Sequence, residues 1–319
     1  MAEIVAGIGT AHTPQMSIAP DKWTILGDGD RNHLKERYDV LMAERGPKLQ
    51  DEVTPSRWQE KYQRAQDAVA KLGKFLEETR PDVLVIVGDD QDELWGPEGQ
   101  PALALFMGDL MWDHPIPETQ VPAPIRMGLW AWHHHEPDPY PIEHRLSRHL
   151  LESLIAQNFD VTQFSRQIPG RPLGHAFTFA RRRLGLARHV PIVPVILNAH
   201  YPPNQPTPTR CLQLGRALRE AINAWPVDAR VVMMASGGLT HWLIDESLDR
   251  GVLDALESGQ VDRLATLTRE QLTGGTSEVR AWITVGAALS DFKAKTVDYI
   301  PGYRSLAGTG VGMGFLTWQ

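Results

Sequence analysis

The sequence predicts an α/β fold: a single domain in which helices flank a mostly parallel or mixed central sheet. Two observations carry this prediction. Short apolar runs of strand length alternate with longer segments of helical periodicity from one end of the chain to the other. No internal repeat or linker interrupts this alternation, so we expect one domain over residues 1–319.

The predicted elements follow one another in a regular order. The first strand covers residues 4–8, and residues 17–55, which are polar and mixed in charge, are interpreted as an irregular excursion or lid. A long helix over residues 56–80 carries apolar residues at helical spacing, and a buried strand begins at residue 82. Further strands, some with the turn that follows them, are predicted at 101–108, 160–164, 190–203, 229–238 and 310–318, and further helices at 141–159, 209–225, 244–256 and 276–289.

The composition is that of a globular protein, with 42% hydrophobic and 22% charged residues. A net charge of -7 without a basic block argues against nucleic acid as a partner. Cys211 is the single cysteine, so no disulfide can form within the chain, and we expect a reducing cytoplasm. No apolar run reaches the roughly 18 residues of a membrane span, and the first residues lack the basic start of a signal peptide.

Polar side chains stand where the predicted strands end. His12, Gln91, His200 and His241 each follow a strand, and Glu278 begins a late helix. Each has an ordinary structural explanation: a histidine after a strand is often only hydrogen-bonded, and the helix dipole favours an acid in the first turn. Together they predict one crevice, because ligands of open α/β sheets bind at the carboxyl ends of the strands. Two histidines and a carboxylate with open coordination positions form non-haem Fe(II) sites.

Five blocks in the same order resemble a known family: "IVAGIGTAHTP", "DVLVIVGDDQDE", "VPVILNAHYPPNQPTPTRCLQLGRALREAI", "ASGGLTHWLIDE" and "GTSEVRAWITVGAAL". They are similar to the class III extradiol ring-cleavage dioxygenases, the superfamily of the protocatechuate 4,5-dioxygenase catalytic subunit. The nearest branch is that of the larger single-chain gallate and 3-O-methylgallate dioxygenases. The resemblance runs from residue 2 to the C-terminus and is weakest over 17–55 and 110–140.

The resemblance implies a role for each matching residue. His12 and Glu278 match iron ligands, and His241 matches the histidine that acts as acid–base catalyst beside bound dioxygen. His175, in "LGHAF", matches a histidine behind the ligands that contacts the substrate. Tyr201 falls where the substrate pocket is lined.

The sequence departs from the family at the end of the second strand, where Gln91 stands in place of the second histidine ligand. An amide oxygen is a weaker ligand for iron than imidazole and suits Mg, Ca or Mn better. Three alternatives remain open: Gln91 or neighbouring Asp90 binds the metal, His200 supplies the missing imidazole, or the site binds metal weakly or not at all. We take Gln91 as the ligand, since it fills the family's histidine position and shares a strand face with Asp89.

Two further segments bear on the pocket. Arg304 could bind a substrate carboxylate through both arms of its guanidinium, although a structural ion pair explains it equally well. The adjacent histidines at 133–135 cannot all face one metal, and they predict a loop, one member of which could reach the pocket. The expected substrate-binding residues are His200, Tyr201 and Arg304.

The sequence thus predicts an Fe(II)-dependent extradiol dioxygenase that cleaves a carboxylated catechol or methoxy-catechol with O2, with Mn(II) or another divalent ion as the alternative metal. One rival is a metal-dependent lyase or hydrolase that uses the same pocket. The other is a non-catalytic subunit, against which the intact His12, His241 and Glu278 speak. A homodimer without nucleic-acid or membrane partners is the expected assembly.

Overall fold

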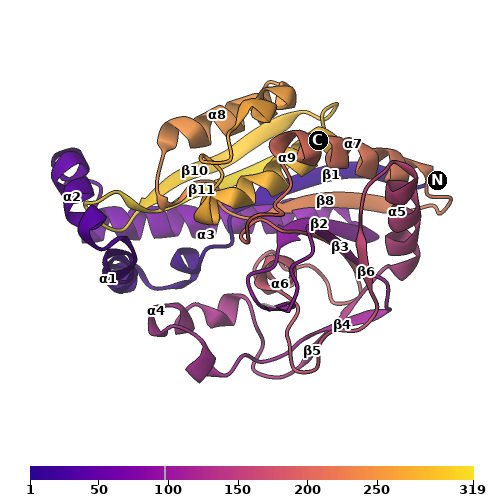
Figure 1. Ribbon diagram of the computed structural model, residues 1–319, viewed down its shortest axis with the longest axis horizontal. Coiled ribbons are helices and arrows are strands. Elements are labelled where there is room, and N and C mark those ends of the chain that lie inside the picture. Colours follow the sequence, from indigo (N-terminus) through magenta and orange to yellow (C-terminus); the bar gives the residue numbers. More distant parts are fainter. Residues whose placement is uncertain (97) are drawn as a thin grey trace.

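A mixed sheet forms the centre of the computed structural model, which describes residues 1–96 and 98–319, and it confirms the predicted α/β fold (Figure 1). Its middle consists of parallel strands in the order β1 (Glu3–Thr10), β8 (Arg230–Ser236), β2 (Val83–Asp89) and β7 (Ile192–Leu197). The carboxyl ends of these strands therefore lie along one edge of the sheet, where sequence-distant side chains can meet.

Antiparallel strands extend the sheet on both sides. On one side β11 (Thr309–Trp318) pairs with β1, and both β10 (Ala294–Tyr303) and the short β9 (His241–Leu243) pair with β11. On the other side β3 (Leu103–Phe106) runs antiparallel to β7, and β6 (Thr162–Phe164) runs parallel to β3. A separate pair is formed by β4 (Leu110–Asp113) and β5 (Asp138–Pro141).

Helices cover both faces of the sheet, as β2 illustrates. Val83, Val85 and Val87 belong to one hydrophobic core and Leu84 and Ile86 to the other, because successive side chains of a strand point to opposite faces. The first core contains α5 (His144–Ala156), α7 (Pro208–Ala224), α8 (Glu246–Glu257) and α9 (Val279–Ala288); the second contains α3 (Pro55–Thr79) and α6 (His175–Arg182). Figure 1 shows α7, α8 and α9 on the side of the sheet opposite to α6.

The sequence predicted that residues 17–55 are irregular, and this prediction was wrong. They form α1 (Trp23–Leu34) and α2 (Glu36–Leu49), which extend from one end of the molecule (Figure 1). Few apolar side chains anchor them: Trp23 and Leu26 of α1 pack with Trp58 of α3, and Tyr38 and Leu41 of α2 pack with Ala307. Because so few positions are buried, the apolar residues of this segment show little helical periodicity, and neither helix was predicted from the sequence. Their role as a lid stays a prediction.

The remaining elements are short. They comprise α4 (Ala123–Arg126) and 3-10 turns at Pro14–Ser17, Pro20–Lys22, Glu118–Gln120, Leu129–Ala131, Val261–Thr266 and Gly274–Glu278. The last of these turns directly precedes α9. Within residues 1–96 and 98–319, no helix combines the length and the apolar character that crossing a membrane requires.

The contact between α7 and α9 depends on a glycine. A Cβ atom at Gly215 of α7 would lie 2.0 Å from the backbone oxygen of Thr284, so Gly215→Ala must push the two helices apart. We expect a loss of about 1–3 kcal/mol of stability, the usual cost of overpacking, measured as a lower midpoint in urea unfolding. Gly251→Ala is the matched control, because this glycine of α8 has no described atom within 4 Å of such a Cβ. It should raise the midpoint slightly, and equal effects of both variants would contradict the packing argument.

Candidate active site

One cavity of about 670 Å³ opens at the carboxyl edge of the sheet. The residues predicted from sequence that line it are His12, Gln91, His175, His200, His241, Glu278 and Arg304. Within the described residues, Tyr201 does not line it. Hydrogen bonds between the Tyr201 backbone and the Asn198 side chain hold the turn after β7, and this turn presents His200 to the cavity in its place.

His12 lies in the turn after β1 and is fixed in one tautomer. Its Nδ1 lies 3.0 Å from Ser236 Oγ, and Ser236 Oγ donates its proton to the Ala176 carbonyl. The hydroxyl must therefore accept from His12 Nδ1–H, which leaves Nε2 with a free lone pair. Burial, followed by the charge of His175, lowers the pKa of His12 to about 3. His12 is thus neutral, which is the form of histidine that binds metal ions.

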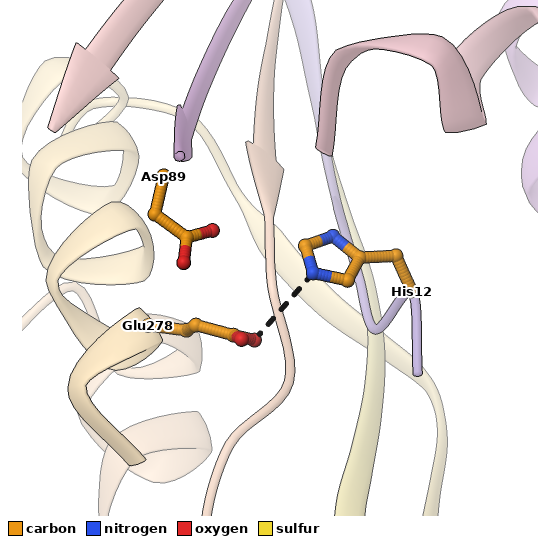
Figure 2. A group of neighbouring side chains, drawn as sticks. All are labelled: His12, Asp89 and Glu278. Atoms are coloured by element: carbon orange, nitrogen blue, oxygen red, sulfur yellow. Dashed lines mark ion pairs between the residues drawn. The ribbon is translucent and has the colours of Figure 1, made fainter. Parts of the chain in front are cut away.

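The free Nε2 of His12 faces two carboxylates, Asp89 and Glu278 (Figure 2). It lies 3.8 Å from Glu278 Oε2, and one ligand atom from each of the three residues lies within 4.8 Å of the others. All three side chains are buried. Asp89 was not among the ligands predicted from sequence, although it is the last residue of β2.

These donors fit a divalent metal ion. Within residues 1–96 and 98–319, neither His12 Nε2 nor Asp89 Oδ1 has a hydrogen-bond partner, although both are buried. A buried polar atom without a partner is costly unless a ligand satisfies it. A neutral imidazole and two carboxylates bind metals at roughly 2.0–2.2 Å, so three atoms this close together can share one ion.

The two residues after Asp89 in the metal-binding segment, Asp90 and Gln91, face in different directions. Gln91 Nε2 donates to Asp89 Oδ2 and to Glu278 Oε1, both at 3.1 Å, and so links the two carboxylates. Asp90 faces away, because its oxygens accept hydrogen bonds from the backbone N–H groups of Leu94 and Trp95. The alternative that Asp90 binds the metal therefore has no support in the geometry.

His200 contacts the same carboxylate, with Nδ1 2.9 Å from Asp89 Oδ2. Burial alone would raise the pKa of Asp89, but His200 outweighs it and the pKa falls to about 2. Burial and the charge of Asp89 raise the pKa of Glu278 to about 8. Like charges held this close cannot both ionise easily, so the two carboxyl groups titrate far apart. A bound cation would relieve this repulsion.

His241 faces the same group from β9. Its Nδ1 lies 3.0 Å from the Leu239 carbonyl oxygen and donates to it, so Nε2 carries the lone pair and lies 3.4 Å from Glu278 Oε2. Burial lowers the pKa of His241 to about 4. Its ring packs on two glycines: a Cβ at Gly238 would lie 2.3 Å from the ring carbon Cε1, and a Cβ at Gly275 would lie 2.4 Å from the ring carbon Cγ. The glycine pairs before His241 and Glu278 thus make room for the histidine ring.

A buried chain of acids and histidines stands behind His175. Glu93 accepts from the backbone N–H of His175 and contacts its Nδ1 at 2.8 Å, and its other contact is His133 Nε2 at 3.2 Å. Asp113 of β4 contacts His133 Nδ1 at 2.6 Å. Sequence reasoning missed Glu93 and Asp113, and it had read the histidines at 133–135 only as a loop from which one member could reach the pocket. His133 is the member that does so.

The neighbouring carboxylates favour the protonated form of these histidines. Burial alone would lower the pKa of His133, but Asp113 and Glu93 outweigh it and raise the pKa to about 9. Burial likewise opposes a charge on His175, and Glu93 again raises the pKa. The cavity thus combines His12 and His241, whose pKa values are lowered mainly by burial, with His133, His175 and His200, whose pKa values are raised by neighbouring carboxylates.

Arg304 forms the ion pair that the sequence left open as an alternative. Its Nε and Nη2 donate to the two carboxylate oxygens of Asp30 on α1, both at 2.6 Å, and Nη1 donates to Gln15 Oε1 at 3.3 Å. Arg304 still lines the cavity. Because Asp30 takes the Nε–Nη2 edge of the guanidinium, bidentate binding of a substrate carboxylate through that edge would require this pair to open.

The acid–histidine chain predicts a measurable pH effect. In Glu93→Gln the pKa of His133 should fall from about 9 toward its ordinary value of about 6.5, as followed by NMR of the imidazole protons. A raised pKa stabilises the fold fully below about pH 6.5, and this contribution is lost as the pH rises through about 9. The variant should therefore show a flatter loss of stability over this range. Exposed Glu136 supplies the control Glu136→Gln, and an unchanged His133 pKa in Glu93→Gln would refute the assignment.

Comparison with known proteins matches the chain to a family and shows its similarity to an enzyme. Residues 46–314 match the family described as the catalytic LigB subunit of aromatic ring-opening dioxygenase. The chain is also similar to gallate dioxygenase of Pseudomonas putida (strain KT2440), with 33% identity over a 159-residue alignment; the match covers 46% of this chain and 45% of that enzyme. The chain thus matches less than half the length of this relative.

Proposed function

Because the chain belongs to the LigB family of aromatic ring-opening dioxygenases, as its sequence resemblance implied, we propose that it is a non-haem Fe(II)-dependent extradiol dioxygenase. The proposed substrates are O2 and a carboxylated catechol or methoxy-catechol of the protocatechuate, gallate or 3-O-methylgallate type. The observation that carries the proposal is the buried Nε2 of His12, which has no hydrogen-bond partner among the described residues and lies within 4.8 Å of a carboxylate oxygen of Asp89 and of Glu278.

His12 and Glu278 would hold the metal ion, together with a ligand from the end of β2, for which the sequence proposed Gln91. When bound, the ion supplies a Lewis acid with open positions for the catechol oxygens and O2. The protein fixes these ligands from behind: Ser236 orients the ring of His12, and the Gly238 N–H donates to Glu278 Oε2. Such outer contacts keep ligands in the orientation that binding requires.

His241 is the proposed acid–base residue. Its Nδ1 proton is committed to the Leu239 carbonyl, so Nε2 is free to take a proton from a catechol hydroxyl. The pKa of about 4 keeps the ring neutral before the reaction, and Nε2 can return the proton to the ring-opened product. Its place beside Glu278 in the cavity supports this role.

The other cavity residues are proposed to hold the substrate. His175, whose pKa is raised by Glu93, offers positive charge to an anionic substrate, and His133 reinforces it. His200 and Arg304 line the same cavity, and both stay proposed substrate-binding residues. Tyr201 also stays a proposal, as a residue behind His200. A cavity of about 670 Å³ has room for a substituted aromatic ring.

The two carboxylates favour a second candidate, a metal-dependent lyase or hydrolase, because oxygen donors also suit metals that do no redox chemistry. The close approach of His12 and Glu278 speaks against a non-catalytic subunit. We retain the cytoplasm as the proposed location, which fits the single, buried Cys211, and a homodimer as the proposed assembly.

Dioxygen uptake tests the proposed function. Protein purified without oxygen and loaded with Fe(II) is mixed with protocatechuate, gallate, 3-O-methylgallate and unsubstituted catechol, and a monophenol serves as the negative control. We expect one O2 to be consumed per molecule of a carboxylated catechol, with a ring-opened product identified by mass spectrometry. Metal-loaded protein that consumes no O2 with any catechol would contradict the proposal.

His241→Ala tests the acid–base assignment. Turnover should fall by roughly 10²–10⁴-fold, the usual contribution of a general acid–base group, while metal content and substrate affinity stay unchanged. His144→Ala is the matched control, since His144 is 44% exposed and pairs with Asp109 on the surface, and it should keep full turnover. Loss of the metal from His241→Ala would make His241 a ligand and overturn its role.

A further inference from the structure

We propose that Asp89 is the third protein ligand of the metal ion, and that Gln91 positions the two carboxylate ligands without binding the metal. The inference deepens the proposed function and rests on it only for the presence of a divalent metal. It replaces the sequence-based choice of Gln91 and gives a ligand set of one histidine and two carboxylates, His12, Asp89 and Glu278.

The sheet fixes Asp89 more firmly than Gln91. Asp89 is the last residue of β2 and pairs with Leu197 of β7, so its backbone is held in register, and the side chain is 2% exposed. Gln91 lies beyond the strand in a bend and is half-buried. A metal ligand must be held within a few tenths of an ångström, which favours the residue that belongs to the sheet.

The free atoms point to the same choice. Asp89 Oδ2 contacts His200 and accepts from Gln91, whereas Asp89 Oδ1 is buried and has no partner among residues 1–96 and 98–319. His12 Nε2, which faces Asp89 and Glu278, is likewise buried and without a hydrogen-bond partner among the described residues. A lone pair on nitrogen and one on oxygen are thus left free in one small space, and a metal cation satisfies both.

Gln91 presents the wrong end of its amide. Its Nε2 donates at 3.1 Å to Asp89 and at 3.1 Å to Glu278, so the NH2 group, which cannot bind a metal, faces the carboxylates. Turning the amide over would place an acceptor against two carboxylate oxygens. Gln91 is therefore a positioning residue that spans the gap between the two acidic ligands.

Each of the three ligands then has a partner behind it. Ser236 contacts His12, His200 and Gln91 contact Asp89, and the Gly238 N–H and Gln91 contact Glu278. This is the usual construction of a metal site, in which outer partners orient the ligands and set their protonation.

The ligand set has a consequence for the metal. Two carboxylates carry a charge of -2 and neutralise a divalent ion, whereas the two histidines and one glutamate that the family resemblance implied leave a net positive centre. Oxygen donors favour harder ions, so the site should prefer Mn(II) and Fe(II) relative to Zn(II) more strongly than a site with two imidazoles.

Binding of Mn(II) tests the inference without any measurement of turnover. The loss of the free Mn(II) signal in electron paramagnetic resonance gives the affinity of the wild type, Asp89→Asn, Gln91→Ala and Asp92→Asn. We expect Asp89→Asn to weaken binding by more than the roughly 10–100-fold that loss of an outer partner costs, and Gln91→Ala to stay within that range. Asp92→Asn removes the same charge from an exposed position with φ 62°, a conformation that asparagine adopts readily, so it should bind like the wild type.

The reverse pattern would overturn the inference: Gln91→Ala loses Mn(II) while Asp89→Asn keeps it. Equal weakening by Asp89→Asn and Asp92→Asn would also overturn it, because the effect would then come from charge alone. Thermal denaturation without metal checks that each variant folds, and the Gln91→Ala arm decides the question even if Asp89→Asn is unstable. Wild type that binds Mn(II) with this pattern yet cleaves no catechol would contradict the proposed function and leave the ligand assignment intact.

Discussion

The site depends on one unfavourable contact: two carboxylates, Asp89 and Glu278, held close together out of water. Burial and mutual repulsion raise the pKa of Glu278 to about 8, while His200 keeps the pKa of Asp89 near 2. A fold tolerates such a pair only where something offsets the charge, and His12 Nε2, which has no hydrogen-bond partner among the described residues, marks the place. In our account a bound metal ion would offset this charge, in addition to the contacts of His200 and Gln91.

The fold produces this contact by bringing distant segments to one edge. His12 follows β1, Asp89 ends β2, and Glu278 closes the turn before α9 (Figure 2). Glycines permit the close approach: a Cβ at Gly237, where φ is +155°, would lie 2.8 Å from Glu278 Cβ, and Gly275 leaves space for His241. The same glycines are thus required for the loop conformations and for the packing of the site. Substitutions in the glycine pairs should therefore lower catalytic activity as well as stability.

The sequence predicted those features of the structure that follow from short-range patterns of apolar and polar residues. Buried strands and their polar ends were visible in the sequence, so the fold and the meeting of His12, His241 and Glu278 in one cavity could be anticipated. The orientation of Asp89 toward His12 could not be anticipated, because whether Asp89 or Gln91 faces the metal-binding group depends on the residue at which β2 ends. Glu93 and Asp113 escaped notice because their contacts with His133 join residues 40 and 20 positions apart, which no local pattern reveals. The helices within 17–55 were missed because few of their side chains are buried.

The central claim is that this cavity inserts both atoms of O2 into an aromatic ring. Turnover of the Fe(II)-loaded protein under ¹⁸O2, followed by mass spectrometry of the product, tests it most directly. Our account predicts that a carboxylated catechol yields a ring-opened product with two ¹⁸O atoms. A product without ¹⁸O would contradict it, and would favour the lyase or hydrolase that the oxygen-rich ligand set also suits.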